Sequence, residues 1–165
     1  MIDDEVQVAA TKAFEALRAR KLKLVTAESC TGGLVAAAIT EIPGSSDVLE
    51  RGFVTYSNAA KQSELGVRPE TIRTRGAVSA ETAEAMALGA LERSPADLSV
   101  AITGIAGPSG GSAEKPVGLV HFAAARRGGQ SRLREVRFGD IGRSEVRRRS
   151  VLVALGLIGE LAAET

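Results

Sequence analysis

The stretch Thr26-Ala27-Glu28-Ser29-Cys30-Thr31-Gly32-Gly33 separates two apolar segments of different pattern. Residues 22–25 before it alternate as a strand does, and residues 34–39 after it are continuously apolar, as in a helix. A strand that passes through a tight turn into a helix places that turn at the carboxyl edge of a sheet, where the first N–H groups of the helix are unpaired. We therefore expect Ser29 to lie at the mouth of a site, in a turn that presents a nucleophile.

Helical and strand patterns interleave along the rest of the 165 residues, and no repeat or linker divides them. The sequence predicts a single domain over residues 1–165, with an α/β layered sandwich, a mixed and mostly parallel sheet, and helices on both faces. The expected helices are 3–20, 58–66 with Asn58 as its cap, 69–75, one from Ser79 and one from near Ser144; the further expected strands are 51–57, 97–102, 117–125 and 131–138.

Composition and charge exclude several classes of protein. The formal net charge is +1 and only 3% of residues are aromatic, which argues against a nucleic-acid partner. One cysteine and one histidine cannot form a disulfide or a typical zinc site. No apolar run approaches the roughly 18 residues of a membrane span. We expect a cytoplasmic protein with no metal, no cofactor and no membrane partner.

Three polar, glycine-rich stretches carry the candidate chemistry: residues 26–33, 52–61 and 103–118. If their strands are parallel neighbours, the strand ends converge on one crevice. A serine nucleophile needs a base, and His121, the only histidine, lies in the middle of a predicted strand. A lysine can serve when desolvation lowers its pKa. The pattern favours Lys61 as the base, in a Ser–Lys or Ser–Tyr–Lys arrangement with Tyr56.

Each of these residue types also has an ordinary structural interpretation. Ser29 and Thr31 suit helix N-caps, and Cys30 suits a buried small hydrophobic position. A lysine on a short polar helix is usually solvated, and a tyrosine at a strand end usually packs. Spacing alone does not decide between these interpretations and catalysis. The arginines at 147–149 are expected on the solvated face of the last helix.

Several long motifs together resemble the CinA C-terminal domain family, in register from about residue 5 to the end. They are the stretch 26–33, Gly52-Phe53-Val54-Thr55-Tyr56-Ser57-Asn58 with Lys61, Gly76-Ala77-Val78-Ser79, Thr103-Gly104-Ile105-Ala106-Gly107-Pro108 and Lys115-Pro116-Val117-Gly118. The chain departs from the family at Ser109, where aspartate is frequent, and at Gly139-Asp140-Ile141-Gly142-Arg143, where the family commonly has Gly-Asp-Arg.

The resemblance implies a stand-alone nicotinamide-nucleotide amidase that acts in pyridine nucleotide salvage. Such an enzyme hydrolyses nicotinamide mononucleotide (NMN) to nicotinate mononucleotide and ammonia. The family pattern makes Ser29 the nucleophile, assisted by Tyr56 and Lys61. It also implicates Thr103 and an arginine near the last helix, for which Arg143 is the better match and Arg147 the alternative. The family further implies a homo-oligomer.

The implied mechanism is a metal-free acyl-enzyme reaction in which the oxyanion binds at the start of a helix over 31–41. Thr31, Gly32 and Gly33 would line that position, with help from Thr103. The loop 104–111, including Gly104, and Arg143 would hold the ribose phosphate. The alternative hypothesis is a nucleotide-binding module without catalysis; a third role on DNA, suggested by links of the family to competence and DNA damage, is opposed by the near-neutral charge.

Overall fold

The computed structural model describes residues 1–164, in which helices and strands follow the predicted order. The elements are α1 (Asp4–Ala19), β1 (Leu24–Glu28), α2 (Leu34–Thr40), the 3₁₀ turn η1 (Ser45–Asp47), β2 (Leu49–Val54), α3 (Asn58–Leu65), α4 (Pro69–Arg75), α5 (Ala80–Glu92), β3 (Leu98–Gly104), β4 (Leu119–Arg126), β5 (Ser131–Arg137) and α6 (Arg143–Ala163).

The five strands form one mixed sheet in the order β2-β1-β3-β4-β5. β1 pairs in parallel with β2 and with β3, whereas β4 pairs antiparallel with β3 and with β5. β4 is therefore the one strand of the sheet that runs against the others, and the predicted α/β class is confirmed. This topology places the carboxyl ends of β1, β2 and β3 at a single edge of the sheet.

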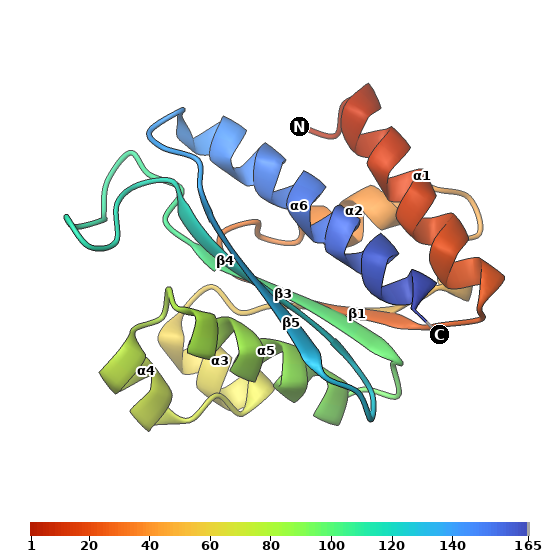
Figure 1. Ribbon diagram of the computed structural model, residues 1–165, viewed down its shortest axis with the longest axis horizontal. Coiled ribbons are helices and arrows are strands. Elements are labelled where there is room, and N and C mark those ends of the chain that lie inside the picture. Colours follow the sequence, from red (N-terminus) through yellow and green to blue (C-terminus); the bar gives the residue numbers. More distant parts are fainter. Residues whose placement is uncertain (165) are drawn as a thin grey trace.

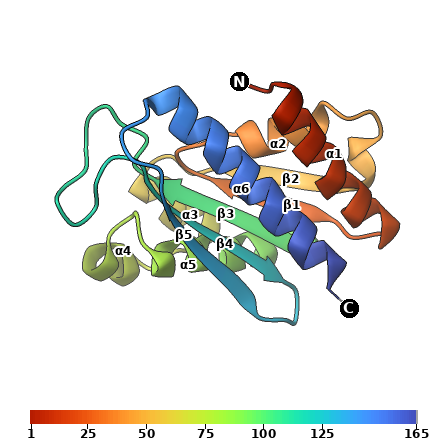
Figure 2. The same cartoon turned by 45° about the horizontal axis from the view of Figure 1, so that its top comes forward.

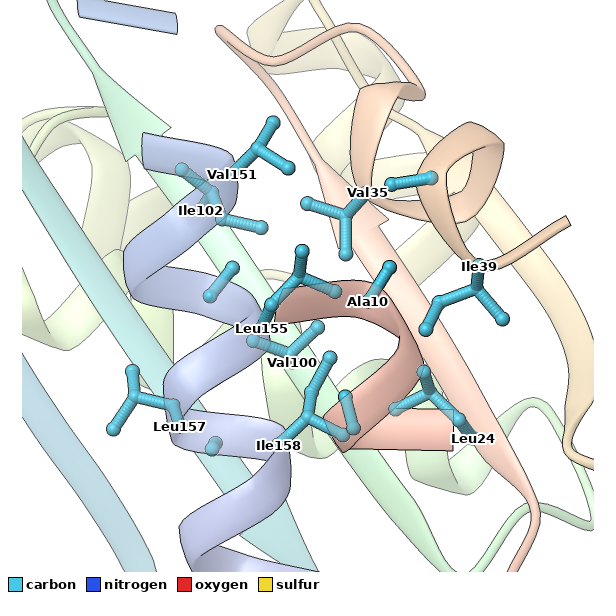
Figure 3. Close-up of a cluster of buried hydrophobic side chains, with 14 of the residues drawn as sticks. Ala10, Leu24, Val35, Ile39, Val100, Ile102, Val151, Leu155, Leu157 and Ile158 are labelled. Atoms are coloured by element: carbon cyan, nitrogen blue, oxygen red, sulfur yellow. The ribbon is translucent and has the colours of Figure 1, made fainter. Parts of the chain in front are cut away.

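Helices cover both faces of the sheet: α1, α2 and α6 lie on one face and α3, α4 and α5 on the other (Figure 1). Under α6, Leu155 and Ile158 pack with Val100 of β3 and Leu24 of β1 (Figure 3). The opposite face packs mainly alanines of α5 and the strands, together with Met86. No helix within residues 1–164 has the length and hydropathy needed to cross a membrane.

Two strands extend further toward this edge than the sequence predicted. β1 continues to Glu28 rather than ending at residue 25, and β3 continues to Gly104, so that Thr103 belongs to the strand and not to the loop. Polarity made these residues look like a turn, but Glu28 and Thr103 are buried, and each has a hydrogen-bond partner from another segment. β2, in contrast, ends at Val54, earlier than the predicted residue 57.

Candidate active site

Ser29 directly follows β1, and its hydroxyl lies beside the amine of Lys61. The Lys61 Nζ is 3.0 Å from Ser29 Oγ and 2.8 Å from the carbonyl oxygen of Thr55. The Ser29 N–H donates to the carbonyl of Ile102 on β3 at 3.0 Å, which fixes the serine to the neighbouring strand. The edge of the parallel strands therefore holds a serine and a lysine in direct hydrogen-bond contact.

Lys61 reaches the serine because α3 turns one face toward the sheet. Ser57 caps this helix by accepting from the N–H of Ala60 at 3.0 Å, and Lys61 and Leu65 are its two buried residues, one helical turn apart. The lysine side chain is 1% exposed. Burial lowers the pKa of Lys61 below its ordinary value of 10.5. A lysine in this state has a larger neutral fraction and can accept a proton.

Glu28, the residue before Ser29, holds the turn in place through hydrogen bonds to its carboxylate. Its carboxylate accepts hydrogen bonds from the Thr31 hydroxyl at 2.6 Å and from the N–H groups of Gly33, Val35 and Ala36 at 3.0–3.1 Å. The N-cap residue Gly33 has no side chain to cap α2, so a buried carboxylate from β1 does so. This corrects the expectation that the first N–H groups of the helix are free for an oxyanion.

Arg147 of α6 contacts the same turn through its carbonyl groups. Its Nε donates to the carbonyl of Cys30 at 3.0 Å, and its Nη2 lies 3.4 Å from that of Thr31. The Gly32 N–H donates to the carbonyl of Ser29 at 3.0 Å and closes the turn. Arg147 is thus a contact of the turn rather than a solvated residue, contrary to the prediction, whereas Arg149 is exposed as predicted.

Tyr56 and Arg143 come together at the mouth of the site. Arg143 Nη2 donates to the Tyr56 hydroxyl at 2.6 Å, and its Nη1 donates to the carbonyl of Gly107 at 2.9 Å. Arg143 can reach the carbonyl of Gly107 because the start of α6 and the loop between β3 and β4 lie at the same end of the sheet (Figure 2). Tyr56 is 60% exposed and bonds to the arginine, not to Ser29 or Lys61.

Thr103 and Gly104 form the wall of the site on β3. The Thr103 hydroxyl donates to the carbonyl of Ala77 at 2.7 Å, which attaches the segment before α5 to the sheet. A side chain at Gly104 would collide with Val120 of β4, at 2.7 Å from its Cγ2 atom. Because Gly104 has no side chain, β4 can pack closely against β3 at this wall of the site.

These residues enclose a cavity of about 200 Å³ at the carboxyl edge of the sheet. Six of the residues that line it are Ser29, Cys30, Tyr56, Asn58, Lys61 and Arg143. Cavities that enclose most of a drug-sized ligand measure roughly 300–1,000 Å³. The volume suits the reacting group of a substrate, with the rest of the molecule at the mouth beside Tyr56 and Arg143.

The structure brings most of the predicted site residues together, but not all of them. Ser29, Lys61, Tyr56, Thr103, Gly104 and Arg143 line the cavity. Within the described residues 1–164, the lining does not include Thr31, Gly32 or Gly33. Their polar groups bond within the turn and to Glu28 instead. His121 lies in β4, 3.8 Å from the carboxylate of Glu135 and outside the cavity lining.

Two residues of the site were not identified as such from the sequence. Glu28 belongs to the first motif but was given no role, although a glycine-ended turn without its own cap is a signal that a carboxylate caps the helix from elsewhere. Asn58 was expected to cap α3, but Ser57 does so, and Asn58 is one of the residues that line the cavity. Burial also raises the pKa of the Cys30 thiol to about 12, so this lining residue is not a thiolate at neutral pH.

Known proteins resemble the chain over nearly its whole length. It is 52% identical over 156 residues to the nicotinamide-nucleotide amidohydrolase PncC of Escherichia coli, which covers 94% of this chain and 93% of that protein. It is 46% identical over 156 residues to a putative competence-damage inducible protein of Acetivibrio thermocellus, covering 94% of this chain and 37% of that longer protein.

Solved structures agree with this relationship. The crystal structure of the competence/damage inducible protein CihA from Agrobacterium tumefaciens superposes with a TM-score of 0.95 at 53% identity, and covers 98% of each chain. A CinA superfamily protein from Klebsiella pneumoniae superposes with a TM-score of 0.90 at 38% identity, covering 96% of this chain and 98% of the other. The family model of the CinA C-terminal domain matches residues 6–162. The chain belongs to the CinA C-terminal domain family.

Proposed function

We propose that this protein is a nicotinamide-nucleotide amidohydrolase that converts NMN to nicotinate mononucleotide and ammonia through an acyl-enzyme on Ser29. The observation that carries the proposal is the 3.0 Å contact between Ser29 Oγ and the buried Lys61 amine. The name of the E. coli relative, at 52% identity, supports the same reaction class. Tyr56 and Arg143 at the mouth supply a hydroxyl and a cation for the nucleotide part.

Lys61 acts as the general base. Its neutral Nζ takes the proton of Ser29 as Oγ attacks the carboxamide carbon, while the carbonyl of Thr55 retains one N–H of the amine and so fixes its orientation. The protonated Lys61 then gives that proton to the amide nitrogen as the C–N bond breaks and ammonia leaves. A water molecule, deprotonated by the same lysine, attacks the ester; Lys61 returns that proton to Ser29 Oγ as the ester C–O bond breaks, and the acid formed ionises to the carboxylate product.

The proposed placement of the substrate follows from the lining of the cavity. The carboxamide lies next to Ser29 and Lys61, and the ribose phosphate extends toward Arg143, whose guanidinium is the lining cation at the mouth. A planar guanidinium suits phosphate because it offers parallel N–H donors. The Tyr56 hydroxyl accepts a hydrogen bond from Arg143 Nη2 and so orients this arginine. Tyr56 is therefore proposed to help bind the phosphate and not to act as a proton relay.

Ammonia release from NMN tests the proposal, with wild type, Ser29→Ala and Lys61→Met compared under identical conditions. We expect turnover in the wild type and its loss in both variants, while binding of nicotinate mononucleotide persists. The matched control is Gln62→Ala, because Gln62 is next to Lys61 on α3 and lies outside the cavity lining. Wild-type binding of NMN without release of ammonia would instead support the alternative of a nucleotide-binding module.

A further inference from the structure

The reaction develops negative charge on the carboxamide oxygen, and the N–H groups at the start of α2 are not available to stabilise it. The Glu28 carboxylate accepts hydrogen bonds from three of them, those of Gly33, Val35 and Ala36. Acyl-transfer enzymes stabilise such an oxyanion with backbone N–H groups or with polar side chains such as asparagine, serine and tyrosine. A donor must therefore come from another part of the cavity lining.

Three polar side chains of that lining already have hydrogen-bond partners. The Thr103 hydroxyl has a single hydrogen, which it donates to the carbonyl of Ala77 at 2.7 Å, so it cannot also donate to an oxyanion. Arg143 donates to the carbonyl of Gly107 and to the hydroxyl of Tyr56, and the exposed Tyr56 places this pair at the mouth. A further cation beside the carboxamide would also be repelled by the pyridinium ring of NMN, which is positively charged.

Asn58 lies on the same face of α3 as the lysine base. It precedes Lys61 by three residues, a spacing that brings two helical side chains together, with their Cβ atoms about 5–6 Å apart. Both residues line the cavity. The Ser57 hydroxyl caps the helix by accepting from the N–H of Ala60, so the cap does not use the Asn58 amide. Among residues 1–164, that amide has no hydrogen-bond partner and is available to a ligand.

Resting on the proposed amidase function, we propose that the side-chain amide of Asn58 is an oxyanion donor, whose NH₂ group bonds to the carboxamide oxygen as Ser29 attacks. A carboxamide beside Ser29 Oγ and Lys61 Nζ, which are 3.0 Å apart, occupies the same small cavity that Asn58 lines. Because the amide is neutral, it stabilises the oxyanion without repelling the pyridinium ring. The asparagine transfers no proton; the proton of Ser29 goes to Lys61.

The kinetic test is Asn58→Ala, with Asn58→Gln as the conservative variant. Removing one oxyanion donor typically costs about 10²–10³ in kcat, and we expect a loss of this size with little change in KM and in melting temperature. Glutamine keeps the NH₂ donor on a longer side chain and should restore part of kcat. The matched control is Gln62→Ala, which removes the same amide group from α3 at a residue outside the cavity lining and should leave kcat unchanged.

A transition-state readout separates this role from ordinary substrate binding. The probe is the analogue of NMN with an aldehyde in place of the carboxamide, whose adduct with Ser29 places an oxygen where the oxyanion forms. Asn58→Ala should weaken binding of this aldehyde by the same factor as kcat, and should leave binding of NMN, measured in the Ser29→Ala background, nearly unchanged. Equal weakening of both ligands, a rise in KM alone, or an unchanged kcat would overturn the inference. A wild type that releases no ammonia would overturn the proposed function itself.

Discussion

Replacement of Glu28 by glutamine tests whether a buried carboxylate holds the nucleophile turn. The amide has the same shape, but it has no charge and only one acceptor oxygen. The Glu28 carboxylate accepts from Thr31, Gly33 and Val35 through Oε2 and from Ala36 through Oε1. In the variant, three of these bonds become neutral, and the fourth N–H faces the NH₂ group of the amide.

The magnitude follows from these contacts. Hydrogen bonds to charged groups contribute about 1.5–3 kcal/mol against about 1 kcal/mol for neutral ones, and a buried donor left unsatisfied costs about 1–3 kcal/mol. Three bonds weakened by at least about 0.5 kcal/mol each and one buried donor left unsatisfied at a cost of at least about 1 kcal/mol together lower the free energy of unfolding by at least about 2.5 kcal/mol. Since small domains have only about 5–15 kcal/mol in total, Glu28→Gln should fold but should unfold at a clearly lower urea concentration.

Equilibrium urea denaturation measures this effect, with Glu41→Gln as the matched control. Glu41 is the exposed C-cap residue of α2, so the same chemical change there should alter the free energy of unfolding by less than about 0.5 kcal/mol. A Glu28→Gln protein within about 1 kcal/mol of wild type would show that the charge of Glu28 does not stabilise the turn, because the four bonds to the carboxylate would then contribute nothing specific to its charge.

Four further predictions concern the lysine, the tyrosine and one glycine. Lys61→Met should abolish turnover yet raise the thermal stability at pH 7, because burial holds the lysine pKa below its unfolded value of 10.5. The folded wild type then binds fewer protons than the unfolded state, so its stability rises with pH between the two pKa values. In a series of melting curves at increasing pH, the stability advantage of the variant should therefore shrink toward pH 10.5. For the same reason, wild-type kcat/KM should rise with pH along a limb set by the lowered lysine pKa, as a pH–rate profile would reveal. Tyr56→Phe removes the acceptor of Arg143 from an exposed side chain, so kcat/KM for NMN should fall about tenfold, through KM, with unchanged melting. Gly118→Ala should reduce soluble folded protein or lower the free energy of unfolding by more than about 2 kcal/mol, because Gly118 has a φ of +91° and its added Cβ would collide with the backbone of Gly139.

The architecture was predictable from local patterns because helix and strand periodicities differ. The order of elements and the convergence of strand ends on one edge follow from alternating and continuous apolar segments. Strand ends were harder to place, because buried polar residues such as Glu28 and Thr103 look like turn residues when their partners are unknown. The partners come from α2 and from the segment before α5, and only the folded chain brings them near.

The pair Ser29 and Lys61 was predicted from residue type and motif, and the structure places the two in contact. The contact of Arg147 with the Cys30 carbonyl and the bond between Tyr56 and Arg143 were not predicted. Each depends on where α6 crosses the edge of the sheet, a tertiary relation between residues 87 and 117 positions apart that local periodicity does not encode.

Trapping the covalent intermediate on Ser29 tests the proposed acyl-enzyme reaction most directly. Wild-type protein mixed with NMN is quenched in acid within the first turnover and digested, and the peptide that carries residues 26–33 is analysed by mass spectrometry. We expect a nicotinate-nucleotide ester on Ser29 that appears with a burst of ammonia and is absent in Lys61→Met. Ammonia release at the full wild-type rate by Ser29→Ala, or a burst with the acyl group on another residue, would contradict it.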